Sequence, residues 1–173
     1  MAATVAAVTE QLSQMTTDSG EPMPYGIELV TNESVHRLNS YVQSRSRAHQ
    51  VEWDWAGIFR DYVTTPSSGW MYALVKTDEV GSMCCGRIEL DFDEEFVTVE
   101  RLERLPDAEE LRGLATSVAD LFATILAELI GAKAVLLVDP DPDLLTHYAK
   151  FGYLAHTDED GDPDKVTYMK KEV

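Results

Sequence analysis

The 173-residue sequence predicts one α/β (α+β) domain, in which helices flank a mixed, mostly antiparallel sheet of six to seven strands. Three strand-like runs follow one another across short turns, which favours an antiparallel meander. A long stretch with helical spacing comes next, and a continuous apolar run follows it. Such a run is typical of a strand buried on both faces, which usually lies parallel to its neighbour after a crossover helix.

The N-terminal part of the chain supplies the first elements. Residues 1–24 are rich in Ala, Thr, Ser and Gln, and we interpret them as a short helix with a linker or as a loose tail. The single domain is expected to occupy residues 25–173. A first strand is predicted at residues 27–30, and residues 31–34 offer caps for a helix that begins near Val35.

A polar, basic segment at residues 44–50 separates that helix from an aromatic one, which contains Trp53 and Trp55. These two indoles either line a substrate or acyl pocket or pack in the core. Residues 66–69 break the chain with Pro, Ser and Gly. The strands of the meander are predicted at residues 70–76, 83–90 and 96–102.

The strongest periodic signal lies in the C-terminal half. Gly131 ends this helix, and the buried strand at residues 134–138 follows. A short helix through Lys150 and a last hairpin around the acidic loop 158–164 complete the chain. One helical face gathers Leu111, Leu114, Ala115, Val118, Leu121, Phe122, Ile125, Leu129 and Ile130.

The charge balance is strongly acidic, with 31 acidic against 14 basic residues and a formal net charge of −17. Such a chain repels nucleic acid and anionic membranes, and it attracts cationic amines, basic peptides and basic proteins. Acidity that only keeps the protein soluble is the plainer interpretation. No apolar run is long enough to span a bilayer, and residues 1–12 have no basic n-region of a secretory signal, so we expect a cytoplasmic protein. A homodimer is left open.

Cys84 and Cys85 are neighbours on one predicted strand, so their side chains point to opposite faces and cannot easily pair. We interpret them as small buried residues in a reducing compartment. Asp139, Asp141 and Asp143 alternate as in calcium loops, but the rest of that pattern is missing and solvated turns are the preferred interpretation. We therefore expect no metal site.

Three short motifs accompany this order of elements. Residues 147–153 (HYAKFGY) resemble the Phe-Tyr-x-x-x-Gly-Phe ending of the fourth helix in the GCN5-related N-acetyltransferase (GNAT) family. Residues 80–83 resemble the turn into its third strand. Leu105-Pro106 and residues 112–117 resemble the junction of its fourth strand with its pyrophosphate loop. The resemblance covers about residues 25 to 170 and implies a GNAT-like fold.

The resemblance also implies chemistry, in which an amine attacks the thioester of acetyl-CoA or another acyl-CoA. Tyr148 stands where the family has the acid that protonates the leaving thiolate. For the base we consider Glu100 and Glu103, which are three residues apart on one strand and therefore on opposite faces, so at most one should face the cleft. Backbone amides at a helix N-terminus suit a pyrophosphate. The implied cofactor-binding residues are Arg112, Gly113, Leu114, Ala115, Thr116 and Ser117.

The start of the long helix is open to two interpretations. Asp107 and Glu110 have capping-box spacing, which would begin the helix near Ala108 and fill the anion site with carboxylates. Local propensity slightly favours that structure. The family pattern instead leaves residues 107–112 as a loop and opens the helix N-terminus near Leu114 to phosphate.

Two functions follow from these alternatives. The first is an acyl-CoA-dependent N-acyltransferase acting on a primary amine of a cationic small molecule, peptide or protein. The second is a catalytically inactive acidic binding protein on the same fold, which engages a basic partner or mimics nucleic acid. The acidic helix start and the net charge of −17 favour the second.

Overall fold

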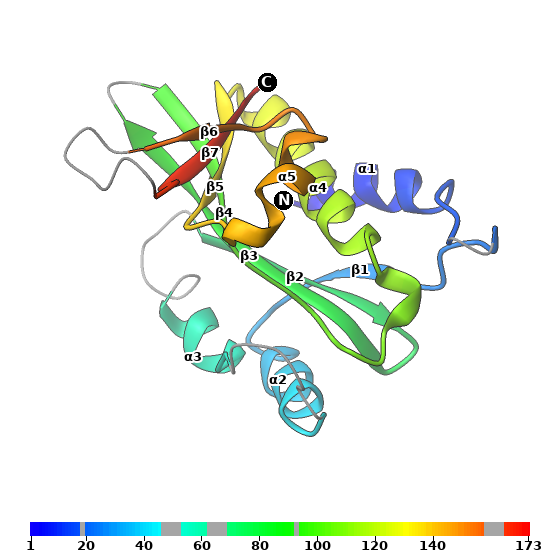
Figure 1. Ribbon diagram of the computed structural model, residues 1–173. Coiled ribbons are helices and arrows are strands. Elements are labelled where there is room, and N and C mark those ends of the chain that lie inside the picture. The colour runs from blue at the N-terminus through cyan, green and yellow to red at the C-terminus, as the bar shows by residue number, and fades with distance from the viewer. Residues whose placement is uncertain (18–19, 46–52, 62–68, 92–93, 158–164) are drawn as a thin grey trace.

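The computed structural model describes residues 1–17, 20–45, 53–61, 69–91, 94–157 and 165–173. Its seven-stranded sheet has the order β1-β2-β3-β4-β5-β7-β6 (Figure 1). Within the described residues the strand pairs are antiparallel except β4 with β5, which confirms the predicted mixed, mostly antiparallel sheet. The strands are β1 (Gly26–Leu29), β2 (Gly69–Lys76), β3 (Glu79–Asp91), β4 (Glu94–Arg104), β5 (Ala134–Val138), β6 (Leu154–His156) and β7 (Tyr168–Glu172).

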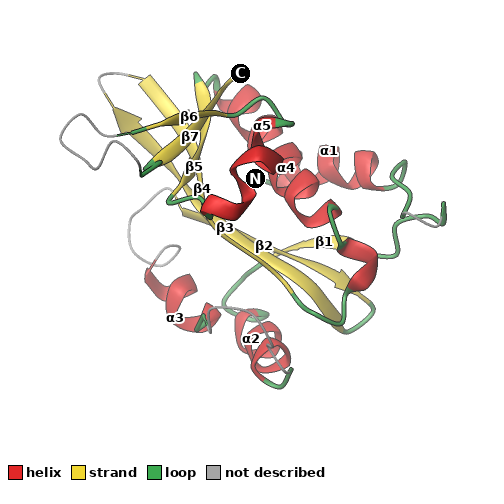
Figure 2. Ribbon diagram, in the orientation of Figure 1, coloured by secondary structure: helices red, strands yellow, loops and turns green. Residues whose placement is uncertain are grey.

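Helices cover both faces of this sheet (Figure 2). Helices α2 and α3 lie on one side, and α1, α4 and α5 lie on the other. Two short 3-10 helices, η2 and η3, precede α4 and α5. The bounds are α1 (Ala2–Leu12), α2 (Val35–Gln43), α3 (Trp55–Phe59), η2 (Glu109–Leu111), α4 (Leu114–Ile130), η3 (Pro142–Leu144) and α5 (Leu145–Ala149). No helix of the described residues is long and apolar enough to cross a membrane.

Several sequence predictions fall partly outside the described residues, namely the polar segment 44–50, the break at 66–69 and the acidic loop 158–164. The meander strands are present and longer than predicted. The turn before β3 is tight and lies at Thr77-Asp78, where Thr77 has a φ of 57°. Within residues 1–24, the segment Ala2–Leu12 forms α1, which buries Val8 and Leu12 beside α4.

Helix α4 packs its apolar face on the sheet, as its periodicity predicts. Phe122 is fully buried there, with its ring centroid 5.1 Å from that of Trp70 and 4.8 Å from that of Tyr72. Leu129, which the sequence placed on this face, is instead 55% exposed. The helix ends at Gly131, whose φ of 75° is the left-handed conformation that glycine adopts most easily.

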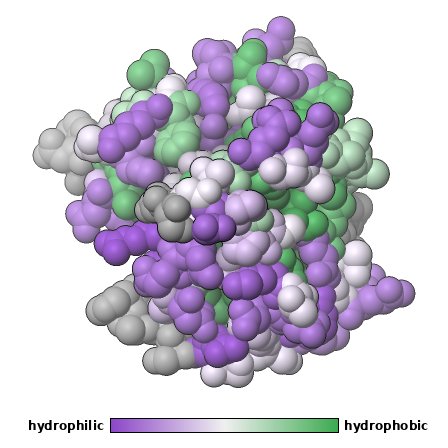
Figure 3. Space-filling view, turned by 90° about the vertical axis from the view of Figure 1, so that its right-hand side faces the viewer, coloured by the Kyte–Doolittle hydropathy of each residue, from purple (hydrophilic) through white to green (hydrophobic). Residues whose placement is uncertain are grey.

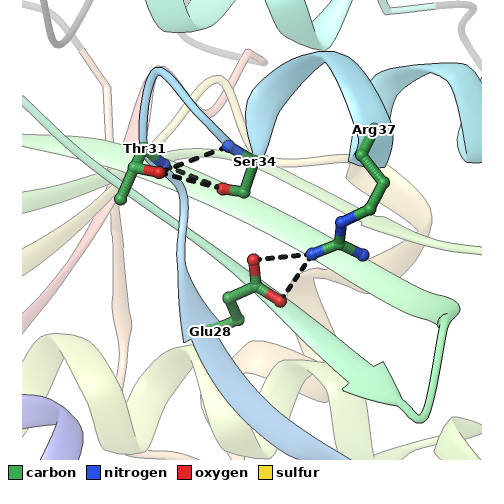
Figure 4. A network of polar contacts seen from close by, with 4 residues as sticks. All are labelled: Glu28, Thr31, Ser34 and Arg37. Atoms are coloured by element: carbon green, nitrogen blue, oxygen red, sulfur yellow. Dashed lines mark hydrogen bonds and ion pairs between the residues drawn. The ribbon is translucent and has the colours of Figure 1, made fainter.

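The junction between β1 and α2 shows how the chain turns onto the other face of the sheet (Figure 4). Helix α2 begins at Val35, as predicted, but Ser34 makes no capping bond to the helix. The Ser34 hydroxyl accepts a hydrogen bond from the Thr31 amide at 3.0 Å, so the two residues close the turn between them. Arg37 donates to both carboxylate oxygens of Glu28, at 2.8 and 2.9 Å, and ties the helix to the strand.

A β-bulge interrupts the pairing of β3 with β4. Gly86 pairs with Val99 and Cys85 pairs with Arg101, so Glu100 is the extra residue. A Cβ atom at Gly86 would overlap the carbonyl oxygen of Thr98, which is why glycine is needed at this position. The bulge lies between β3 and β4, two inner strands of the sheet, and shifts their register by one residue.

Both cysteines are buried and free, on β3. Burial raises the pKa of the Cys85 thiol to about 12, and it also raises the pKa of Cys84. Protonated thiols of this kind behave as small apolar core residues, in line with the sequence interpretation. The surface is very different, because hydrophilic residues cover much of the face shown in Figure 3.

Candidate active site

A cavity opens where β4 and β5 part from each other. The two strands pair in parallel only from Phe96 to Val99 and from Ala134 to Leu137. Strand β4 then continues to Arg104, whereas β5 ends at Val138. A cavity of about 730 Å³ occupies this divergence. The second half of β4 thus forms a cavity wall where a regular sheet would have had a neighbouring strand.

The cavity is lined from both sides of the sheet. Trp53, just before α3, lines it on one side, and Thr116 of α4 and Tyr148 of α5 line it on the other. Because α3 and α5 lie on opposite faces, the cavity passes through the sheet between the two strands. The lining consists of Trp53, Val99, Glu100, Arg101, Leu102, Glu103, Thr116, Ala119, Asp120, Leu137, Val138, Asp139, Pro140, Asp141, Leu144, Tyr148 and Tyr153.

Both candidate bases line the cavity, so the expectation that at most one would reach it is wrong. The physical reason is that β4 pairs with β5 only as far as Val99, so the cavity lies at an open edge of the strand, and all residues from Val99 to Glu103 line it whichever face they point to. Glu100 is ion-paired, with its carboxylate 3.2 Å from Arg87 Nε and 3.9 Å from Arg101 Nη1. Glu103 is only 4% exposed, and its Oε2 accepts a hydrogen bond from Trp55 Nε1 at 2.6 Å.

The wall on the α3 side is fixed by α2. Asn39 Oδ1 accepts a hydrogen bond from the Trp55 amide at 3.0 Å, and Gln43 Nε2 donates to the Trp53 carbonyl at 3.1 Å. The two indoles meet edge to face with centroids 5.5 Å apart. Trp53 lines the cavity while Trp55 is fully buried, so both interpretations of this aromatic pair apply, one to each residue. The sequence offered no signal for the contact with Glu103.

Tyr148 is half-buried on α5, on the other side of the cavity. Burial, together with the Asp141 carboxylate and the Cys84 thiol, raises the pKa of its hydroxyl above the usual value. The hydroxyl therefore keeps its proton at neutral pH and can donate it. The sequence motif placed this residue, and the structure brings it to the same cavity as Glu100 and Glu103.

The structure at the N-terminus of α4 decides between the two interpretations of where this helix starts. Glu109 and Glu110 belong to the separate turn η2, and Arg112 is extended. Gly113, with a φ of 75°, then starts α4 at Leu114. The prediction of an early helix capped by Asp107 is therefore wrong, because Arg112 is extended and Gly113 is left-handed before the long helix begins. No side chain caps α4.

The predicted cofactor-binding residues lie at this helix start but differ in exposure. Thr116 lines the cavity, whereas Ala115 is buried and Arg112 is exposed. A Cβ atom at Gly113 would meet nothing within 4 Å, so open space lies beside the first turn. The Ser117 hydroxyl donates to the Gly113 carbonyl at 3.2 Å. Leu114 is half-buried.

A polar cluster that the sequence did not indicate forms another part of the wall. Lys171 Nζ of β7 lies 2.7 and 3.0 Å from the carboxylate oxygens of Asp120 on α4, and 3.1 Å from the Thr124 hydroxyl. Tyr153 is buried close by, and burial and the Asp120 carboxylate raise the pKa of its hydroxyl. These residues are far apart in sequence, so only the fold could bring them together.

The fold and the divergence of β4 from β5 define the class of structure, which is the GNAT fold. The GNAT domain of S. lividans PAT superposes with a TM-score of 0.65 at 13% identity, covering 92% of this chain and 95% of that one. A GNAT-family acetyltransferase from Staphylococcus aureus Mu50 gives 0.61 at 11% identity, covering 86% of this chain and 98% of that one. Naa50 from Arabidopsis thaliana, solved with the bisubstrate analogue CoA-Ac-MVNAL, gives 0.56 at 13% identity, with 87% and 99% covered.

No protein-family model and no curated protein sequence matches this chain. At 11 to 13% identity these structural matches establish a GNAT-like fold and nothing finer. Function has to be argued from the cavity itself.

Proposed function

We propose that this protein is an acyl-CoA-dependent N-acyltransferase that acts on a primary amine of a cationic small molecule, peptide or protein. The observation that carries the proposal is the cavity through the sheet, with carboxylates on β4 and a protonated tyrosine on α5. Amine acylation needs this combination, because one group must accept a proton from the amine and another must donate one to the leaving group.

The residues present fit an acyl-CoA. The uncapped N-terminus of α4 offers unpaired amides and the positive end of the helix dipole to a pyrophosphate. Open space beside Gly113 leaves room for a ligand to approach this turn. The residues that would hold it are Arg112, Gly113, Leu114, Ala115, Thr116 and Ser117. When bound, the cofactor supplies an activated acyl thioester.

Different side chains of the cavity would then accept and donate the protons of the reaction. Glu103 or Glu100 would accept a proton from the ammonium group of the substrate, directly or through water, which leaves the neutral amine free to attack. Tyr148 would supply a proton for the leaving thiolate, and its raised pKa keeps that proton on the hydroxyl at neutral pH. Carboxylates outnumber cations in the lining, with Glu100, Glu103, Asp120, Asp139 and Asp141 against Arg101 among the described lining residues. Glu100, Asp120 and Asp139 are ion-paired, so the attraction of a cationic acceptor rests mainly on the net charge of −17.

Thermal unfolding with and without millimolar acetyl-CoA tests the proposal. At about 100 times the Kd, a ligand stabilises the fold by roughly 2.7 kcal/mol, which is a clear rise in Tm. Tyr148→Phe should show the same rise, because Tyr148 is proposed as an acid and not as an anchor. Thr116→Glu should abolish it by adding a carboxylate to the cavity wall at the helix start. No rise in the wild type would contradict the proposal.

The acidic surface supports a second candidate, a GNAT-fold binding protein without catalysis. A net charge of −17, with Glu109 and Glu110 just ahead of α4, suits a basic partner or mimicry of nucleic acid. This candidate requires no effect of acetyl-CoA on Tm. It also requires binding to a basic protein that weakens steeply as salt is raised.

A further inference from the structure

We propose that this protein has a second binding site, which takes a small organic cation with a primary ammonium group. The site is a polar pocket of about 180 Å³, and its described lining residues are all different from those of the cavity between β4 and β5. The inference stands apart from the proposed acyltransferase function, because none of the residues assigned to that function line this pocket. The lining consists of Tyr25, Tyr41, Arg45, Glu79, Val80, Asp107 and Ala108.

The pocket lies where three segments of the chain meet. The start of β3 supplies one side, the segment between β4 and η2 supplies another, and the C-terminal end of α2 supplies the third. Arg45 joins the last two, because its guanidinium lies 3.4 Å from the Asp107 carboxylate and donates a hydrogen bond to the Tyr41 hydroxyl at 2.7 Å. Side-chain contacts between distant parts of the sequence therefore hold the rim in place.

Tyr25 is the buried polar residue of this pocket, and only 6% of it is exposed. Its ring lies against Gly81, where an added Cβ atom would overlap Cε1 and Cζ, and Cζ is the carbon that bears the hydroxyl. Among the described residues the hydroxyl has no hydrogen-bond partner. A buried hydroxyl without a partner is costly, and a ligand in the pocket would supply one.

Carboxylates surround this hydroxyl. Burial and three nearby carboxylates raise the pKa of the Tyr25 hydroxyl to about 12. The carboxylates are those of Glu110, Glu79 and Asp107. Glu79 and Asp107 also line the pocket, so the hydroxyl and the carboxylates face the same space.

The charges around the pocket do not balance. Asp107 is ion-paired with Arg45 at 3.4 Å, and Glu110 is ion-paired with Lys76 at 3.5 Å. Glu79 is exposed and has no ion-pair partner among the described residues. Three carboxylates therefore stand against two cations, which leaves one negative charge at the pocket for a ligand to neutralise.

A primary ammonium group matches these features. It carries one positive charge and three N–H donors, whereas the pocket offers the carboxylate oxygens of Glu79 and the hydroxyl oxygen of Tyr25 as acceptors. A hydrogen bond to a charged group is stronger than one between neutral groups. The small volume of the pocket restricts the rest of the ligand to a short carbon chain.

Methylammonium is the probe, and tetramethylammonium is its matched control, because it has the same charge and no N–H donor. Two-dimensional amide NMR spectra of the wild type are recorded while methylammonium chloride replaces tetramethylammonium chloride at constant total salt. We expect saturable shifts at the amides of Val80 and Ala108, which line the pocket. The amides of Val99 and Leu137, which line the cavity, should change little.

Three variants sharpen the test. Glu79→Gln should weaken the affinity about 10-fold and Tyr25→Phe about 3- to 10-fold, because each removes an acceptor for the charged N–H donors. Tyr25→Phe should fold like the wild type, since the hydroxyl that it removes has no partner in the protein among the described residues. Asp78→Asn removes the same charge from the neighbouring position, which does not line the pocket, and should change the affinity by less than about 2-fold.

The outcomes decide the inference. Shifts confined to the amides of the cavity would place the cation there and overturn the second site. Shifts that do not saturate, or equal affinities in the wild type and in Glu79→Gln, would overturn it as well. A loss in Asp78→Asn as large as that in Glu79→Gln would show that the net charge attracts the cation and that the pocket does not bind it.

Discussion

The two halves of β4 differ in what lies beside them. From Phe96 to Val99 the strand pairs on both edges, with β3 and with β5. Glu100 is the bulge residue, and from Arg101 to Arg104 the strand pairs with β3, while residues up to Glu103 line the cavity. The first half contributes Val97 and Val99 to the core, whereas the second half carries both candidate bases. The bulge at Glu100 therefore marks the boundary between the half of β4 that pairs on both edges and the half that lines the cavity.

Gly86→Ala tests the bulge at the boundary between the two halves of β4. The new Cβ would overlap the Thr98 carbonyl and crowd the Trp70 indole, and backbone cannot move aside as a flexible side chain can. We expect a loss of about 3 kcal/mol in the free energy of unfolding. Chemical denaturation measures it, and a variant within about 0.5 kcal/mol of the wild type would show that the bulge tolerates a side chain. Gly113→Ala is not an equivalent control, because its φ of 75° adds strain of its own.

Tyr148→Phe tests the cavity that the second half of β4 lines, from the opposite wall on α5. We expect kcat to fall about 10- to 100-fold, because the leaving group loses its proton donor. The fall should be uniform from pH 6 to 9. The raised pKa keeps the Tyr148 hydroxyl protonated across that range, and ionisation would remove the donor only at higher pH. A kcat equal to that of the wild type would exclude Tyr148 as the acid.

Arg37→Ala acts far from either half, on the ion pair between β1 and α2. The pair is exposed, with 46% of the Arg37 side chain and 34% of the Glu28 side chain accessible. We expect a loss of about 0.5 kcal/mol or less, reduced further by salt. Equilibrium denaturation at low and high ionic strength checks this. An effect of Arg37→Ala on the rise in Tm with acetyl-CoA would mean that α2 is coupled to the cavity through more than Asn39 and Gln43.

Much of the fold followed from patterns that need no tertiary knowledge. The strand-like runs with short turns of the meander and the apolar stripe of α4 are local signals, and both elements were predicted to within a few residues. Tyr148 was found in the same way, through a short motif. Glu100 and Glu103 stay a pair of candidate bases, because both line the cavity and the period of two does not choose between them at an open strand edge.

The start of α4 shows the limit of local reasoning. Asp107 and Glu110 have the spacing of a capping box, yet the chain uses Arg112 and Gly113 to leave helical geometry first. Asp107 instead lies 3.4 Å from Arg45, a residue more than sixty positions earlier in the numbering. A capping preference of about 1 kcal/mol is small enough for tertiary contacts to override it.

The sequence by itself determined the fold class, the order of the elements, the acidic charge and the place of Tyr148, because each depends on neighbours along the chain. The tertiary structure alone decided that β4 parts from β5 after Val99, that Glu100 is bound by arginines and that Glu103 meets Trp55. These are contacts between residues distant in sequence. Packing selects them only once the whole sheet and both helical layers are in place.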